Sequence, residues 1–132
     1  MRLLRTVLYV EALGLLVWAV LAGLFPGPLT AALGERVPHI AEPWVRMTAI
    51  SAFGFAMMMV LVAVEIERRW WFAWAFVLTA LGIAGLSAWT AVAGLLDARA
   101  PRPWWILAAV SGASAVALIV GIGKTGLERQ PE

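Results

Sequence analysis

Four long apolar stretches constrain this chain more than any other feature of its sequence. They occupy residues 4–25, 44–64, 70–96 and 103–123. A helix of about 20 residues crosses the roughly 30 Å hydrocarbon core of a bilayer, because each residue advances it by about 1.5 Å. None of the stretches has the polar stripe of a surface helix, and none alternates as the strands of a membrane barrel do. The pattern predicts an all-α polytopic membrane protein with four transmembrane helices in an up-down bundle.

Composition supports the same class and excludes several others. Hydrophobic residues make up 63% of the 132 residues and charged residues 14%, whereas a soluble domain is typically about 45–50% apolar and about 25% charged. That difference excludes an ordinary soluble globule, a disordered chain and a nucleic-acid-binding module, so no nucleic-acid partner is expected. A single transmembrane domain is expected over residues 1–132, ending in a polar cytoplasmic tail at 124–132.

The short loops carry the basic residues that predict orientation. If the N-terminus is cytoplasmic, that side of the membrane holds Arg2, Arg5, Arg68, Arg69, Lys124 and Arg129. The opposite side holds Arg36, Arg46, Arg99 and Arg102. Basic residues close to the spans favour the cytoplasm, so both termini are predicted to be cytoplasmic. The N-terminal segment, basic and then apolar, also resembles a signal peptide. Its apolar run, however, is longer than the roughly 7–15 residues usual for the apolar region of a signal peptide, and it contains Glu11.

Two charged side chains inside the predicted spans are the sharpest candidates for function. Glu11 lies about two turns inside the first span, where a charge costs up to roughly 2.5–3.5 kcal/mol on insertion scales. Glu11 therefore either holds a proton or a ligand, or makes a structural bond to another span or to an arginine at the cytoplasmic edge. Arg46 lies near the opposite face, where Asp97 and Glu42 are its expected partners.

Tryptophan is unusually frequent, and its positions suggest two roles. Indole rings favour the headgroup level of a bilayer, so the Trp residues at span ends are expected to be interfacial anchors: Trp44, Trp70, Trp71, Trp104 and Trp105. Deeper Trp residues are expected to pack between helices or to line a pocket. The candidate ligand-binding set is Glu11, Trp18, Arg46, Trp89 and Asp97.

Small residues recur at four-residue spacing in the last two predicted spans. They are Ala80, Ala84 and Ala88 in one, and Ala109, Ala113, Ala117 and Gly121 in the other. Stripes of this kind let helix backbones approach closely in lipid. They are expected to be helix-packing interfaces, either within the bundle or against another chain, which leaves a homo-oligomer or a complex with other membrane subunits open.

The sequence offers few residues that could catalyse a reaction or ligate a cofactor. The chain has no Cys, which excludes disulfides, thiolate metal sites and cysteine nucleophiles. Its one His, His39, stands near carboxylates without a ligand spacing such as H-x-x-x-H. No metal site, no cofactor and no catalytic residue are predicted, and haem or an iron–sulfur centre held by this chain is not expected.

The layout resembles the small bacterial four-helix membrane proteins known as DoxX-like. The residues that carry the resemblance are the opening Arg2–Arg5 segment, Gly14, Pro26, Arg46 and Gly54. The resemblance implies a bacterial cytoplasmic (inner) membrane location and, for some members, partnership with redox enzymes.

Three hypotheses for function follow. The first is a small non-catalytic accessory or structural subunit that packs with other membrane chains among the membrane lipids. The second is a binding protein or small transporter for an apolar or amphipathic ligand held within the bundle, which should respond to Glu11→Gln more than to Ala113→Leu. The third, an enzyme, is the least favoured, because no nucleophile–base pair is visible.

Overall fold

The computed structural model describes residues 1–34, 38–96 and 102–128, and all regular structure in these residues is helical. Helices long and apolar enough to cross a membrane lie at Arg2–Leu24, His39–Val64, Ile66–Gly94 and Pro103–Glu128. The prediction of an all-α chain with four spans is therefore confirmed. The chain divides into two compact units: Leu8–Val64, here called the central unit, and Met1–Val7 together with Glu65–Glu132, here called the terminal unit.

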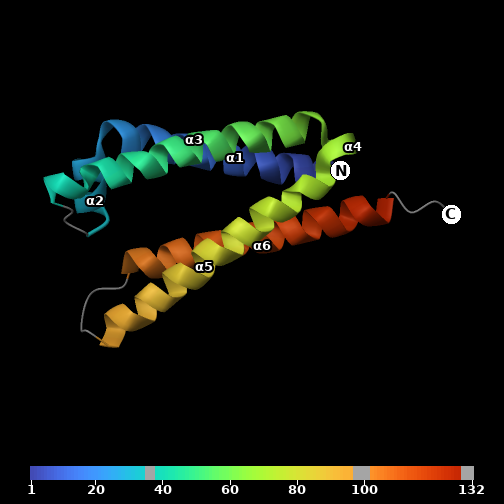
Figure 1. Ribbon diagram of the computed structural model, residues 1–132. Coiled ribbons are helices and arrows are strands. Elements are labelled where there is room, and N and C mark those ends of the chain that lie inside the picture. The colour runs from blue at the N-terminus through green and yellow to red at the C-terminus, as the bar shows by residue number, and fades with distance from the viewer. Residues whose placement is uncertain (35–37, 97–101, 129–132) are drawn as a thin grey trace. The chain divides into compact units, whose positions relative to one another are not determined.

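The central unit is a pair of long helices joined by short helical pieces (Figure 1). Its elements are α1 (Arg2–Leu24) from Leu8 onward, α2 (Pro26–Ala32), the 3-10 helix η1 (His39–Ala41) and α3 (Glu42–Val64). Pro26 starts α2, because a proline lacks the N–H that the first helical residue leaves unbonded. Beyond the end of α2, Gly34 has a φ of 83°, a left-handed conformation that glycine adopts without strain.

Small side chains allow α1 and α3 to approach each other. A Cβ added to Gly23 in α1 would lie 3.6 Å from the Cβ of Ala49 in α3, which is ordinary van der Waals contact. The buried residues of the two helices include Ala12, Ala22, Ala49, Ala52 and Ala56. Close approach of helix backbones at small residues is the usual basis of helix association in lipid.

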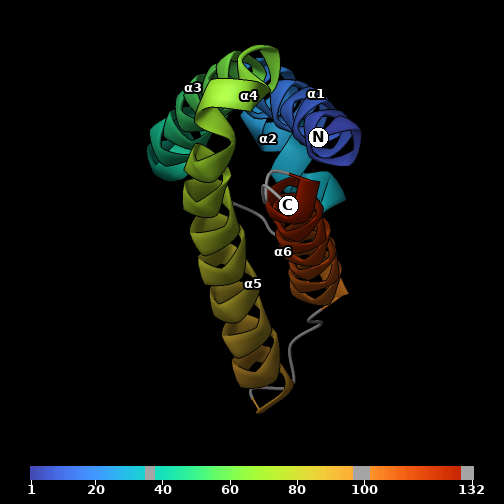
Figure 2. The same cartoon turned by 90° about the vertical axis from the view of Figure 1, so that its right-hand side faces the viewer.

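The terminal unit is built on a second pair of long helices, which lie side by side in both views (Figures 1 and 2). After the short α4 (Ile66–Arg69) and the 3-10 helix η2 (Trp70–Phe72) come α5 (Ala73–Leu96) and α6 (Arg102–Glu128). Helix α6 continues to Glu128, so residues 124–128, which were expected to begin the polar tail, are helical.

The buried faces of α5 and α6 follow alternating spacings of four and three residues. In α6 the buried residues with this spacing are Ser111, Ala115, Leu118, Ile122 and Thr125. In α5 they include Ala73, Val77, Ala80, Ser87 and Ala91, with the half-buried Ala84 between. This average period of about 3.5 residues keeps one seam facing the partner along the whole contact, as in a coiled coil.

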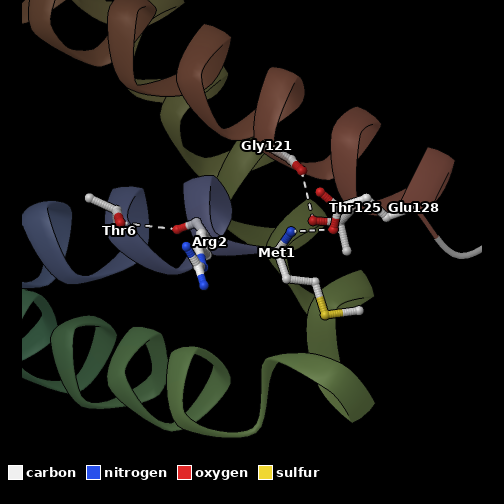
Figure 3. Close-up of polar contacts among 6 residues, drawn as sticks. All are labelled: Met1, Arg2, Thr6, Gly121, Thr125 and Glu128. Atoms are coloured by element: carbon white, nitrogen blue, oxygen red, sulfur yellow. Dashed lines mark hydrogen bonds and ion pairs between the residues drawn. The ribbon is translucent and has the colours of Figure 1, made fainter.

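The first residues of α1 pack on the end of α6 within the terminal unit. Leu4 is fully buried, and a Cβ added to Gly121 would lie 3.1 Å from the Leu4 Cα. One turn later, Thr125 is buried and its hydroxyl donates a hydrogen bond to the Gly121 carbonyl at 2.9 Å. Figure 3 shows the Met1 ammonium beside these residues, bound to the Glu128 carboxylate at 2.6 Å. Glycine at position 121 is thus what allows this close contact.

The outer surfaces of the helices are strongly apolar. Ile50 in α3 and Leu86 in α5 are 74% and 67% exposed. Of the 18-residue apolar windows in the four candidate spans, 17% to 33% is buried inside the chain. Lipid tails can cover such surfaces at no hydrophobic cost, whereas water cannot.

Gly121→Leu is expected to destabilise the chain by about 1–3 kcal/mol, the range typical of an overpacked contact. The added side chain must enter the space next to the Leu4 backbone, which cannot move aside as a flexible side chain would. Thermal unfolding in a mild detergent, followed by circular dichroism, measures the effect.

Gly123→Leu is the matched control for this substitution. Gly123 lies in the same helix, but a Cβ there meets nothing within 4 Å. The control is expected to unfold within a few degrees of the unmodified protein, and equal losses of stability in the two variants would contradict the packing role of Gly121.

Candidate functional site

The ligand-binding candidates are distributed over both units. Glu11, Trp18 and Arg46 belong to the central unit, and Trp89 belongs to the terminal unit. Asp97 lies outside the described residues. We therefore describe the candidates by their own surroundings, one unit at a time.

Trp18 joins α1 to α3 through a hydrogen bond. Its indole Nε1 donates to the Thr48 Oγ1 at 3.2 Å, and the Thr48 hydroxyl in turn donates to the Val45 carbonyl at 2.6 Å. The Thr48 hydroxyl thus accepts one hydrogen bond through its oxygen and donates another through its O–H. Trp18 is half-buried and held in place by this contact, so its position is explained by helix pairing, and its availability to a ligand stays a hypothesis.

Glu11 lies on α1, seven residues before Trp18, and is half-buried. Glu11 has an interaction partner in the structure. Residues seven apart lie on nearly the same face of a helix, so Glu11 and Trp18 share one face of α1. That arrangement is compatible both with a structural carboxylate and with a ligand-binding one, and the functional role of Glu11 stays a prediction.

Arg46 is exposed in the second turn of α3. Of its two expected partners, Glu42 instead contacts His39, whose Nδ1 lies 2.9 Å from the Glu42 Oε1, and Asp97 is outside the described residues. The same Glu42 oxygen lies 3.4 Å from where a Cβ on Gly27 would stand. This carboxylate therefore joins η1 to the start of α3 and lies at van der Waals distance from position 27.

Trp89 is one of the most exposed large side chains, at 74%. It lies on the outer face of α5 together with Leu78, Gly82 and Gly85, at spacings of four, three and four residues. A Cβ added to Gly82 or Gly85 meets nothing within 4 Å. On this face, here called the α5 outer face, Gly82 and Gly85 leave two positions without a side chain close to the large Trp89 ring.

The residues of the two predicted small-residue stripes range from buried to exposed. Ala80 and Gly121 are buried, Ala84, Ala88 and Ala117 are half-buried, and Ala109 and Ala113 are exposed. A strict four-residue spacing turns by about 40° at each step of a helix, since each residue turns by about 100°. The stripe on α6 therefore rotates away from the seam with α5, and Ala109 and Ala113 face outward.

The five predicted Trp anchors lie at helix ends. Trp44 is in the first turn of α3, Trp70 and Trp71 lie in η2, and Trp104 and Trp105 are in the first turn of α6. Their positions follow from the sequence, and the anchoring role stays a prediction.

No metal-binding cluster is found in the described part of the chain. Among residues 1–34, 38–96 and 102–128, no group of three or more His, Cys, Asp or Glu side chains could hold a metal ion. One open depression lies along α1, lined by Leu16, Val17, Val20 and Leu21. Its lining is wholly apolar, so it presents no polar group that would orient a substrate.

Two structural residues, Thr48 and Leu4, were not identified from the sequence. A Thr in an apolar stretch normally bonds its own helix, as Thr79, Thr90 and Thr125 do by donating to the carbonyl four residues earlier. Nothing in the sequence separates Thr48 from these three. The role of Leu4 depends on the long-range contact with Gly121, which has no local signal.

Comparisons of the chain with protein-family models, with curated proteins and with solved structures find no match. The resemblance to DoxX-like proteins stays a prediction.

The Trp18–Thr48 bond can be measured with a double-mutant cycle of Trp18→Phe and Thr48→Val. Each single variant loses the same interhelical bond, so the cycle should yield a coupling energy of about 0.5–1 kcal/mol, the range found for hydrogen bonds between membrane helices. Unfolding in mixed detergent micelles supplies the free energies.

Thr79→Val combined with Trp18→Phe serves as the control cycle. The Thr79 hydroxyl donates to the Ala75 carbonyl of its own helix, so the two substitutions should be additive. A coupling in the control as large as that of the Trp18–Thr48 pair would contradict the assignment.

Proposed function

We propose that this chain is a small non-catalytic membrane subunit that packs its helices against other membrane chains. The observation that carries the proposal is the α5 outer face, with Gly82 and Gly85 exposed and open space where their Cβ atoms would be. Glycine in a helix interior costs about 1 kcal/mol relative to alanine, and no contact described within this chain requires it at these two positions.

Glycines that serve packing within the chain look different. At Gly121 and Gly23, an added Cβ would lie 3.1 and 3.6 Å from atoms of another helix. Small residues at helix interfaces are what bring membrane helices together, because apolar surfaces gain nothing from leaving lipid. Gly82 and Gly85 therefore suit the approach of a helix from another chain, with Leu78 and Trp89 at the borders of the contact.

The exposed part of α6 offers a second surface of the same kind. Ala109 and Ala113 are exposed and continue into Val116 and Val120 on one helix face. This surface supports the proposal of a packing subunit, whose partner chains are copies of itself or other membrane proteins of a bacterial inner membrane.

Gly82→Leu and Gly85→Leu are expected to remove the partner chain without unfolding the subunit. The open space at both positions accommodates a larger side chain, while the added bulk holds a partner helix away. Native mass spectrometry from mild detergent should show loss of the assembly for these variants, and thermal unfolding should show a stable chain.

Two comparisons decide the outcome. Gly54→Leu, also at an open and exposed position but on α3 and outside both proposed packing surfaces, should leave the assembly intact. A monomeric unmodified protein in mild detergent, or an assembly that survives both α5 substitutions, would reject the proposal. If Glu11→Gln releases a retained lipid-like molecule while Ala113→Leu has no effect, the ligand-binding alternative replaces it.

A further inference from the structure

One end of the terminal unit brings three segments of the chain together. The start of α1 contacts α6 where Leu4 meets Gly121. The α4–η2 segment contacts α6 where a Cβ on Gly126 would lie 4.0 Å from the Trp70 ring. We call this end, formed by residues 1–7, 65–72 and 121–128, the basic end.

The carboxylates of the basic end are already engaged. The Glu65 Oε2 lies 2.7 Å from the Arg69 Nε, and the Glu128 Oε2 lies 2.6 Å from the Met1 ammonium. The third carboxylate, Glu67, is not free either. These three carboxylates are outnumbered by the cations of the basic end, which are the Met1 ammonium, Arg2, Arg5, Arg68, Arg69 and Lys124.

Four further cations belong to the basic end, and one of them, Arg5, has an interaction partner. Arg2, Arg68 and Lys124 are all exposed, and none of them has an ion pair among the residues that the structure describes. Figure 3 shows the Arg2 guanidinium directed away from the Glu128 carboxylate. The basic end thus presents outward positive charge that its own described carboxylates do not neutralise.

An aromatic pair lies in the same segment of the basic end as Arg68. The rings of Trp71 and Phe72 are stacked, with centroids 4.1 Å apart and an interplanar angle of 24°. Both side chains are exposed, at 55% and 43%. Their segment begins the candidate span Ile66–Gly94, and the preceding candidate span ends at Val64, so this segment joins two consecutive spans, as a loop at a bilayer surface would.

We propose that the basic end binds the headgroup phosphate of an anionic phospholipid. Arg2, Arg68 and Lys124 supply the counter-charge, and a guanidinium matches phosphate oxygens with two parallel hydrogen bonds. Trp71 and Phe72 pack at the boundary between headgroup and acyl chains, where aromatic rings are favoured. A lipid with net negative charge suits the site better than a zwitterionic one, which brings its own ammonium group.

The test titrates the full chain in mild detergent with phosphatidylglycerol or phosphatidylcholine of identical acyl chains, and measures lipid retention by native mass spectrometry. Phosphatidylglycerol should bind at least about tenfold more tightly. Each charge near a membrane surface changes affinity roughly fivefold. Arg2→Gln, Arg68→Gln and Lys124→Gln together should therefore weaken its binding on the order of a hundredfold.

Two control variants separate charge from packing. Arg68→Lys keeps the charge and should retain most of the affinity. The double variant Glu65→Gln with Arg69→Gln removes an ion pair without changing net charge, so phosphatidylglycerol binding should stay within about twofold. Circular dichroism of each variant confirms that the helices are intact.

The salt dependence of the unmodified protein tests the proposal without any substitution. Phosphatidylglycerol affinity should fall as salt rises, because ions screen exposed charges, while phosphatidylcholine affinity should not. Equal affinity for the two lipids, unchanged binding by the triple variant, or full displacement of the lipid by an equal concentration of inorganic phosphate would each overturn it.

Discussion

The structure depends on one constraint: inside hydrocarbon, every polar group of the chain must find its partner within the protein. Helices meet this requirement for the backbone. The threonines meet it for their hydroxyls in the same way, since Thr79, Thr90 and Thr125 each donate to the carbonyl one turn earlier at 2.8 to 2.9 Å. The long helices are therefore self-sufficient in hydrogen bonding, and little polar chemistry remains to join one helix to another.

Contacts between the helices must then come from close packing at small residues. The seam between α5 and α6, with its alternating spacings, is lined largely by Ala and Ser side chains beside a few larger ones such as Leu118 and Val77. In the same unit, the contact of Gly121 with Leu4 packs the start of α1 against α6. Where glycine is exposed instead, at Gly82 and Gly85, our proposal is that a helix from another chain makes the close contact.

Charged side chains are concentrated where the helices end. The two proposals therefore concern different parts of the chain. The packing proposal concerns the apolar middle of α5, while the lipid proposal concerns Arg2, Arg68 and Lys124 at the basic end. The first needs a partner chain and depends on shape, whereas the second needs an anionic headgroup and depends on salt. A variant that abolishes one should leave the other unchanged.

The sequence alone determined the helical class and the four spans, because length and apolarity suffice to specify a membrane helix. It also located the helix ends near Pro26 and at the Trp pairs. Only the tertiary structure decided which small residues pack inside: a four-residue stripe drifts around the helix, so Gly121 meets Leu4 while Ala109 and Ala113 face outward. The bond from Trp18 to Thr48 likewise depends on the register between α1 and α3, which no local pattern encodes.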